Sequence, residues 1–440
     1  MSAAATPAES AENEPWPSEG YAWWVVGVLL IAYTVSFIDR MILSLLVAPI
    51  RADLGISDTQ FSLLLGLAFA VFYTLMGLPL GYLADRGNRR RLVTIGVAFW
   101  SVATAACGLA PNFLALFLAR VGVGVGEATL SPSAYSLLAD YFPKDKLGRV
   151  MAIYSIGVPL GSGIALVIGG LVVKWATGAE AMRLPLIGET APWRLVFFIV
   201  GLPGLLVALL MLTVKEPVRR GVSAALSPFG AVFAHVARHP GAYGAHFIGL
   251  SLLVFVIYGG MAWIPTFFAR TYGLAPADAG MIYGAIMALG GAGGLIMGGA
   301  LADHLFRRGR KDAHLRAILI AVLTSAPFFV AMPLMPTPTL AFACLAPAVL
   351  LSSMHGGVAG SALQLITPNQ FRAQITAIYF FIANLIGLGL GPTAVASLAE
   401  YGLGELRYAL AIIAAVVLPF SALVLWIGLK PFRETVAQSA

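Results

Sequence analysis

The motif GYLADRGNRRR, at residues 81–91, follows a long apolar segment, and a related motif, GALADHLFRRGRK at 299–311, follows another. Gly81 and Asp85 of the first motif correspond to Gly299 and Asp303 of the second at one offset of 218 in sequence number. A second pair of stretches, FPKDKLGRVMAIY (142–154) and TPNQFRAQITAIY (367–379), aligns its prolines at an offset of 225. Two independent matches at nearly one offset predict two homologous halves in parallel orientation, as in many secondary transporters.

The composition is that of an integral membrane protein. Of the 440 residues, 59% are hydrophobic and 11% are charged, whereas a soluble domain holds roughly a quarter charged residues. Residues 1–20 are polar, acidic and rich in Ala, Pro and Ser, so we expect a disordered cytoplasmic tail and no signal peptide. The two cysteines, Cys107 and Cys344, are too few for a disulfide framework.

Twelve segments are long and apolar enough to cross a bilayer, since a spanning helix needs about 20 mostly apolar residues. They lie near 22–49, 58–84, 92–110, 113–139, 148–173, 194–214, 242–269, 277–302, 315–334, 338–365, 373–398 and 405–429. We therefore expect an all-α membrane protein with a six-helix bundle at 21–214, a cytoplasmic linker at 215–240, a second bundle at 241–430 and a tail at 431–440. The linker sequence SPFGAVFAHVARH (227–239) indicates a short amphipathic helix on the inner surface.

The distribution of basic residues predicts the orientation. If the N-terminus is cytoplasmic, 19 of the 27 Lys and Arg residues lie on the inner side, six on the outer side and two within helices. An excess of Lys and Arg on the cytoplasmic side is the usual rule for membrane proteins. The sequence thus predicts a multi-pass protein of the inner (plasma) membrane with both termini cytoplasmic. The net charge of +7 reflects this topology, and we expect no nucleic-acid partner.

The chain resembles the major facilitator superfamily over its whole length. GYLADRGNRRR is similar to the loop signature after the second helix of that family, RVGVGVGEA (120–128) to its fourth-helix signature and GVPLGSGIALVIGG (157–170) to its fifth helix, although the usual Gly-Pro pair is absent. FIDRMILSLL (37–46), RADLGISDTQFSLLLGLAF (51–69) and RVGVGVGEATLSPSAYSLLADYFP (120–143) resemble bacterial homologues of the spinster branch. Animal members of that branch move lysophospholipids and sphingosine-1-phosphate. The resemblance implies two pseudo-symmetric six-helix bundles around a central cavity, no cofactor and a monomer.

The inner loops carry a predicted conformational latch. Asp85 lies where the second helix ends, and a carboxylate there can pair with the positive N-terminal end of the eleventh helix. Asp303 would pair in the same way with the fifth helix, and such contacts would hold the cytoplasmic side shut in an outward-facing state. Simple capping and topology are the alternative explanation of these residues. The predicted latch comprises Gly81, Asp85, Arg86, Arg149, Asp303 and Arg372.

Four ionisable residues fall within one band of the membrane. Asp39 and Arg40 lie in the first span, where each charge costs at least about 2.5 kcal/mol on insertion scales. By helical rise, Arg120 and Glu127 of the fourth span reach the same depth. In the superfamily fold both spans line the cavity, so we expect one buried cluster of two acids and two bases.

Each member of this cluster has an expected role. Burial favours a neutral carboxyl group, whereas a neighbouring guanidinium favours the charged form, so Glu127 or Asp39 is the candidate proton-coupling group. Arg40 and Arg120 stay charged and are expected to pair with the acids and to attract an anionic head group. A purely structural set of ion pairs is the alternative.

The second half has no matching charges. At the repeat offset, Glu127 maps near Ser352 and Asp39 close to Met261. A charged wall facing an aromatic and apolar wall suits an amphiphile, although each aromatic alone is more often a packing residue. The candidate substrate contacts of this wall are Tyr258, Trp263, Tyr283, His355, Tyr379 and Asn384.

The leading function is a proton-coupled secondary transporter that works by alternating access on an amphipathic lysolipid-like or sphingoid substrate. The alternative is the same machine carrying a small organic acid or a drug. A membrane enzyme is disfavoured because no metal-binding His pair and no Ser-His-acid set appears. We therefore expect no catalytic residue, no metal and no cofactor.

Overall fold

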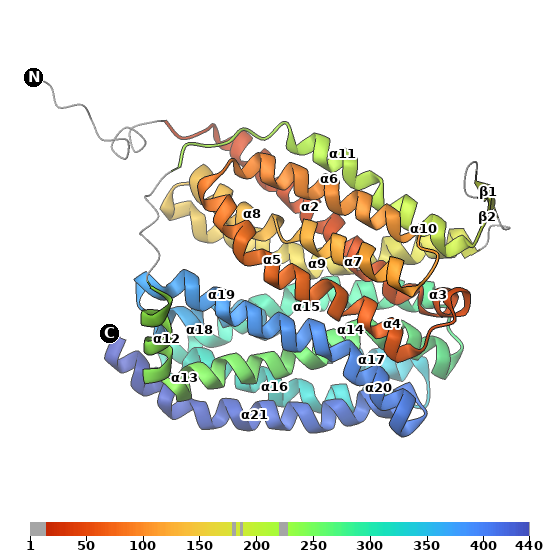
Figure 1. Ribbon diagram of the computed structural model, residues 1–440. Coiled ribbons are helices and arrows are strands. Elements are labelled where there is room, and N and C mark those ends of the chain that lie inside the picture. Colours follow the sequence, from red (N-terminus) through yellow and green to blue (C-terminus); the bar gives the residue numbers. More distant parts are fainter. Residues whose placement is uncertain (1–14, 178–181, 185–187, 220–227, 440) are drawn as a thin grey trace, which may run out of the picture.

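The computed structural model describes residues 15–177, 182–184, 188–219 and 228–439, so most of the predicted disordered tail lies outside the described residues. The helices run side by side between two ends of the molecule, and the described part of the chain begins and ends at the same end (Figure 1). We call this the terminus end and the other the opposite end. The N-terminal half forms one layer and the C-terminal half another.

The N-terminal half contains six spans, several of them interrupted. Their helices are α2 (Glu19–Leu45) with α3 (Val47–Leu54), α4 (Asp58–Leu65) with α5 (Leu67–Arg86), α6 (Arg89–Cys107), α7 (Phe113–Glu127) with α8 (Leu130–Tyr141), α9 (Lys144–Thr177), and α10 (Pro192–Gly201) with α11 (Pro203–Met211).

The C-terminal half repeats this plan. The seventh span consists of α13 (Pro240–Gly244), the π-helical turn η1 (Ala245–Gly249) and α14 (Leu250–Tyr272), the eighth is α15 (Pro276–Arg307), and the ninth is α16 (Ala313–Ala331) with η2 (Met332–Leu334). The tenth span consists of α17 (Pro338–Ser353), the 3-10 turn η3 (Met354–Gly357) and α18 (Ala359–Ile366). The eleventh consists of η4 (Asn369–Phe371), α19 (Arg372–Ala383), η5 (Asn384–Leu390), α20 (Gly391–Leu398) and η6 (Ala399–Leu403), and the twelfth is α21 (Leu406–Ser439).

The element boundaries show the internal repeat. The first span ends at Gly55 and the seventh at Gly273, which is an offset of 218, and both glycines adopt a positive φ that a side chain would strain. The fourth span (113–141) and the tenth (338–366) begin and end at an offset of 225. At the offset of 218, Arg40 corresponds to Tyr258, and Asp39 falls on Ile257, one turn from the predicted Met261.

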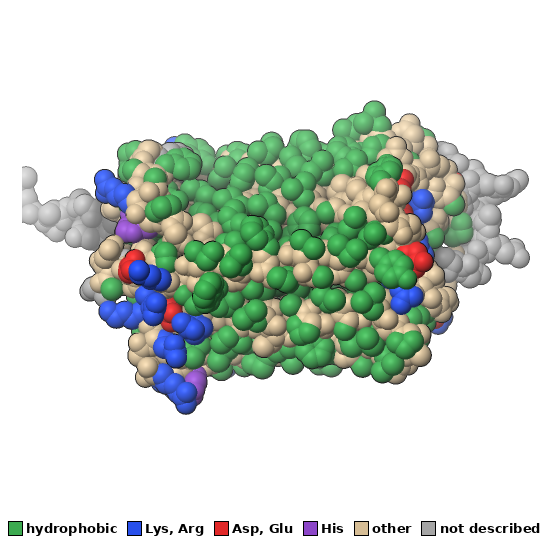
Figure 2. Space-filling view, turned by 90° about the horizontal axis from the view of Figure 1, so that it is seen from below, with side chains coloured by type: hydrophobic (Ala, Val, Ile, Leu, Met, Phe, Trp, Pro, Cys, Tyr) green, Lys and Arg blue, Asp and Glu red, His purple; other side chains and the backbone are tan. Residues whose placement is uncertain are grey.

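Eleven helical stretches among the described residues are long and apolar enough to cross a membrane. The remaining predicted span, at 92–110, corresponds to α6, which begins with three arginines and packs against α7, α10 and α11. Apolar side chains cover the middle of the face in Figure 2, whereas charged side chains gather at its two ends, with Lys and Arg dominating the terminus end. This pattern is that of a multi-pass membrane protein.

Two features differ from the sequence-based expectation, and a third agrees with it. A short antiparallel hairpin, β1 (Met182–Leu184) with β2 (Gly188–Thr190), lies between the fifth and sixth spans. The last helix continues through the predicted tail to Ser439. Within the linker, α12 (Phe229–Arg238) lies across the terminus end of the C-terminal half (Figure 1), where an amphipathic helix was expected.

The two halves meet most extensively along α9 and α15. Cβ atoms built on Gly163 and Gly284 would lie 2.4 and 2.5 Å from the facing backbone oxygens, so only glycine permits this approach. Gly291 in turn lies against Pro159. Beside this seam, α2 of the first span contacts α14, and α5 of the second span contacts η5.

Candidate functional site

Two helix breaks mark the candidate site. The fourth span is interrupted at Ala128 and Thr129, directly after Glu127, and the tenth span is interrupted by η3, directly after Ser353. Because the two spans are related by the offset of 225, the breaks are equivalent. At both places the backbone stays right-handed and the helix is locally distorted, so the two halves share an irregularity beside the candidate site.

Glu127 forms an ion pair with Arg40 at the first of these breaks. The Nε–H of Arg40 donates to Oε2 of Glu127 at 2.5 Å. The Glu127 side chain is fully buried, whereas the Arg40 side chain is 12% exposed. The structure therefore joins the first and fourth spans through this pair, as the sequence predicts, and Arg40 is its more accessible partner.

Aromatic rings surround the guanidinium group of Arg40. Its Cζ lies 5.2, 4.6 and 5.0 Å from the ring centroids of Phe37, Phe69 and Tyr73. Tyr33 continues this aromatic wall by stacking on Tyr154 at 5.1 Å. Cation–π contacts of this kind stabilise a cation where water is scarce, by about 2 kcal/mol when it is desolvated. This group of aromatic side chains around Arg40 was not predicted from the sequence, because aromatic residues are frequent throughout such spans.

Asp39 and Arg120 are buried beside the pair but are arranged differently from the expected cluster. Nη1–H of Arg120 donates to the backbone oxygen of Asp39 at 3.0 Å, and its Nε–H donates to the backbone oxygen of Leu64 at 3.4 Å. The Asp39 carboxylate lies near Arg120 and beside Trp100 and Thr104 of α6, but neither of its oxygens has hydrogen-bond geometry to a partner among the described residues. Adjacent helical residues point about 100° apart, so Arg40 and Asp39 face different neighbours.

Four predicted contacts of the C-terminal half lie near its inner wall. Tyr258 is half-buried, lies in the neighbourhood of Arg40 and packs against the core of both halves. Tyr379 of α19 is buried in the core of this half with its ring against that of His246, and half-buried Asn384 begins the π-helical turn η5. His355 lies in η3 and donates through Nδ1–H to the oxygen of Ser352 at 2.6 Å.

The other two predicted contacts belong to the core. Trp263 is fully buried and its Nε1–H donates to the backbone oxygen of Pro392 at 2.8 Å. Tyr283 is 2% exposed and lies within the apolar core of α15. Both therefore serve helix packing in this structure. Within the described ranges, no group of three or more His, Cys, Asp or Glu side chains is placed to hold a metal ion.

The predicted latch residues do not meet in this structure. Asp85, Arg149 and Asp303 are exposed at the terminus end. Arg86 lies over the ring of Tyr82 on its own helix, and a Cβ atom added at Gly81 would have no neighbour within 4 Å. Exposed Arg372 donates to the oxygens of residues 364 and 367 in its own half. The terminus end thus lacks the contacts expected of a closed latch between these residues.

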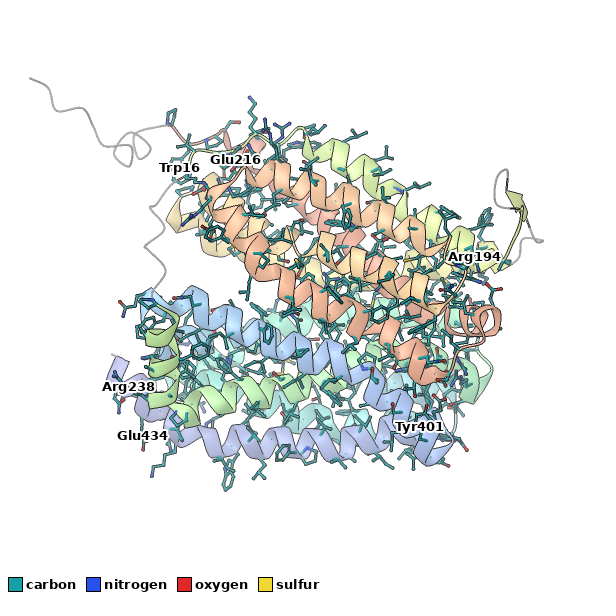
Figure 3. The ribbon with its side chains drawn as sticks, viewed as in Figure 1. Trp16, Arg194, Glu216, Arg238, Tyr401 and Glu434 are labelled. Carbon is teal, nitrogen blue, oxygen red and sulfur yellow. The ribbon has the colours of Figure 1, made fainter. Side chains whose placement is uncertain are left out.

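At the opposite end, polar contacts join the two halves, and the sequence did not predict these contacts. Asp58 at the start of α4 pairs with Arg51 of its own half at 2.9 Å and with Arg270 of the other half. The backbone N–H of Thr59 donates to Glu400 at 2.8 Å, again across the halves. Lys174 and Asp278 form a more exposed cross-half pair at 3.0 Å. Arg194 and Tyr401 mark this end in Figure 3. Ion pairs and a hydrogen bond therefore hold the two halves together at the opposite end.

A further cluster fastens the terminus end of the N-terminal half internally. Arg89, the first residue of α6, is fully buried and pairs with Asp140 of α8 and, at 2.7 Å, with Glu216. Glu216 lies at this end in Figure 3. The burial of Arg89 was not predicted, because a run of three arginines at a helix start gives no pattern that distinguishes a buried arginine from an exposed one.

Two pseudo-symmetric bundles of membrane-spanning helices, with buried charges and broken helices where they face each other, define a membrane transporter. The chain belongs to the Major Facilitator Superfamily, whose family model matches residues 29–392. This membership makes it a multi-pass membrane protein that moves small molecules.

Several relatives refine this placement. The structure of a bacterial homologue of the human lysosomal transporter spinster, in an inward-facing and unoccupied conformation, superposes with a TM-score of 0.77 at 30% identity, covering 96% of this chain and 98% of the other. Protein spinster homolog 1 of Mus musculus is 30% identical over 84% of this chain and 71% of its own length. An MFS-type efflux pump of Mycolicibacterium smegmatis is 28% identical over 95% of both chains. The predicted resemblance to the spinster branch is confirmed.

Proposed function

We propose that the protein is a proton-coupled transporter that works by alternating access and moves an amphipathic, lysolipid-like or sphingoid molecule. The proposal includes residence in the plasma membrane, with both termini in the cytoplasm and with a monomer as the working unit. The observation that carries the proposal is the buried Arg40–Glu127 pair at the break of the fourth span. It stands beside an aromatic wall and opposite a half that presents Tyr258 at the equivalent position.

The pair provides a chemically reasonable proton site. A buried carboxylate is tolerated while a guanidinium neutralises it, and protonation removes the need for that partner. Arg40 cannot give up its own proton. When Glu127 takes a proton, Arg40 is released to bind an anionic head group, and the arrival of that head group in turn favours protonation of Glu127. Asp39, which faces α6, is the second candidate acid.

The polar contacts of the two ends support alternating access. Cross-half pairs at Asp58 and Lys174 fasten the opposite end, while the latch residues of the terminus end lie apart. We assign this arrangement to an inward-facing state and expect Asp85 and Arg372 to approach each other in the outward-facing one.

Proteoliposomes with an imposed proton gradient test the proposal. We expect a labelled lysophospholipid to cross the bilayer in response to the gradient with the native protein, and the response to disappear in Glu127→Gln. Ser352→Ala, at the equivalent position of the other half, is the matched control and should retain the response. Gradient-dependent flux that persists in Glu127→Gln would remove this residue from the mechanism.

A second candidate is the same machine carrying a drug or a small organic acid. The similarity to the efflux pump of Mycolicibacterium smegmatis over 95% of both chains favours it. Growth inhibition of a drug-sensitive host that expresses the native protein or Glu127→Gln separates the candidates. A raised tolerance that needs Glu127, together with no lysophospholipid flux, would select this second function.

A further inference from the structure

His246 is a fully buried polar residue that the proposed mechanism does not use. It lies in η1, a π-helical turn within the seventh span. Turns of this type are rare and occur frequently at functional sites. The side chain therefore occupies an irregular position in the helix that corresponds to the first span, which carries Arg40.

The ring of His246 makes one hydrogen bond, and that bond crosses to another span. Its Nε2–H donates to the backbone oxygen of Ala359 at 2.9 Å. Its Nδ1 atom has no partner among the described residues. Ala359 begins α18, directly after the break that contains His355. In an apolar interior such a bond is strong, because neither group has water as an alternative.

The same ring also contacts the eleventh span. Tyr379 meets it edge-on, with ring centroids 4.9 Å apart, and Phe247 lies nearly parallel to Tyr379 at 6.2 Å. Tyr379 in turn lies in the neighbourhood of Tyr258. A single side chain thus touches the tenth and eleventh spans, and these carry His355 and Tyr379 of the C-terminal wall.

We propose that His246 is a positioning residue of the transport site: it fixes the break of the tenth span against the seventh and eleventh spans and so sets where His355, Tyr379 and Tyr258 stand. This role deepens the proposed function and rests on it for the identity of the site. The exposed small and polar residues of the tenth span after the break, Gly356, Gly357, Gly360, Ser361 and Gln364, are placed by the same bond.

We call the contact of His246 with Ala359 the brace. It differs in kind from the Arg40–Glu127 contact of the N-terminal half. The first and fourth spans are joined by Arg40 and Glu127, whose attraction ends when the carboxylate is protonated. The seventh and tenth spans are joined through the oxygen of Ala359, which is not titratable. The brace therefore holds through a transport cycle in which the Arg40–Glu127 contact is made and broken.

Three substitutions separate the contributions of the ring. His246→Phe keeps an aromatic ring against Tyr379 but removes the donor, and His246→Gln keeps a donor but removes the ring. Ser251→Ala is the matched control, because Ser251 is buried in the same span and bonds only to residue 247 of its own helix. His246→Leu, which has a smaller side chain, replaces His246→Phe if the phenyl ring prevents folding.

Hydrogen–deuterium exchange of the full-length protein in nanodiscs decides the structural part without any substrate. We expect backbone amides of residues 356–363 to exchange about fivefold faster in His246→Phe, which is the effect of losing about 1 kcal/mol of hydrogen-bond stabilisation. His246→Gln and Ser251→Ala should stay near the native rate. Unchanged exchange in His246→Phe, or equally fast exchange in His246→Gln, would overturn the brace.

Transport of a fluorescent lysophosphatidylcholine in proteoliposomes decides the functional part. We expect His246→Phe to raise KM several-fold while the dependence on pH stays native, in contrast to Glu127→Gln. A changed pH profile with a native KM would overturn the positioning role. If the native protein moves none of this probe, the proposed substrate fails, and the exchange rates still decide whether His246 holds the break.

Discussion

The two halves of the molecule share a fold but differ in charge at their equivalent positions. Arg40 in the first span corresponds to Tyr258 in the seventh, and Glu127 in the fourth corresponds to Ser352 in the tenth, while the helix bounds of the fourth and tenth spans repeat at one offset. The architecture was thus kept in both halves, whereas the ion pair is present in one. The comparison teaches that a buried ion pair in such a fold needs only one half, and that the other half is free to present a neutral wall.

The largest effect is expected when the charge of Arg40 is removed, because this charge distinguishes the first half from the second at equivalent positions. Arg40→Ala leaves Glu127 buried without its partner, which costs about 3–5 kcal/mol of folding stability for a buried pair, and it should abolish lysophospholipid flux. Tyr258→Phe, at the equivalent position, should change stability by less than about 1 kcal/mol. Thermal unfolding in detergent and proteoliposome flux measure the two outcomes. Equal losses in the two variants would show that the halves contribute alike.

The second comparison concerns the clusters at the terminus end. Arg89 is fully buried between Asp140 and Glu216, whereas Arg316 of the other half is 27% exposed and shares Asp312 with Arg433. We expect Arg89→Gln to lower the free energy of unfolding by about 3 kcal/mol, since it strands two acids. Arg316→Gln should cost less, because Arg433 remains beside the buried carboxylate of Asp312. Chemical denaturation in mixed micelles gives both values; a larger loss for Arg316→Gln contradicts the expectation.

The third prediction addresses the fastening between the halves. Asp58→Asn weakens the contacts to Arg51 and Arg270 and should shift the population toward opening of the opposite end by about tenfold, the effect of about 1.4 kcal/mol. Lys174→Gln breaks an exposed cross-half pair and should shift it little.

Spin labels report this shift directly. Ala52 and Tyr401 are exposed on the two sides of the opposite end, so cysteines there, in a background of Cys107→Ala and Cys344→Ala, take nitroxide labels. A longer mean distance in Asp58→Asn than in Lys174→Gln is the expected result. Identical distance distributions would show that Asp58 does not fasten the halves.

The smallest effect is expected at the linker helix, which has no counterpart in the repeat. His235 of α12 lies 3.0 Å from the hydroxyl of Tyr243 and its ring is 5.3 Å from that of Phe371. Tyr243 already donates to the oxygen of Ile366, so the Nε2–H of His235 is the donor to Tyr243. Burial, with nearby His239 and Arg238, lowers the pKa of His235 below its usual value of 6.5.

The sign of the pH effect follows from this pKa. Because the docked helix binds a proton less readily than the free helix, docking is strongest above pH 6.5 and weakens as the pH falls below it. Limited proteolysis of the linker should therefore be faster at pH 5.5 than at pH 7.5 in the native protein and equally fast at both in His235→Gln. A protease that is fully active at both values is needed. The native pattern persisting in His235→Gln would exclude this residue as the cause.

Most of the architecture could be predicted from local patterns. The repeated motifs around Asp85 and Asp303 indicated the two halves, and the apolar lengths indicated the spans, because a bilayer imposes a nearly fixed length on every helix. The interruption at η3 and the π-helical turn η1 could not be predicted in this way. Such irregularities are decided by contacts with neighbouring spans, and no single stretch of sequence contains those contacts.

The sequence predicted how deep the site residues lie along their helices but not the direction in which their side chains point. Helical rise correctly placed Arg40 and Glu127 at one level, where they pair. It could not show that Asp39 turns toward α6 or that Trp263 and Tyr283 are packed in the core, since depth says nothing about which side of a helix faces its partner. The contact between Asp58 and Arg270 was equally hidden, because the two residues are 212 positions apart in sequence.

The seam between α9 and α15 has a mechanical consequence. Where Gly163 and Gly284 touch, the backbones are so close that the halves have no room to approach further, and the seam can act as a fulcrum. Two rigid halves that rotate about one shared contact cannot separate at both ends at the same time. A leak-free membrane barrier would then come from the pivot itself, and a methyl group at Gly163 or Gly284 would loosen the barrier on both sides of the bilayer.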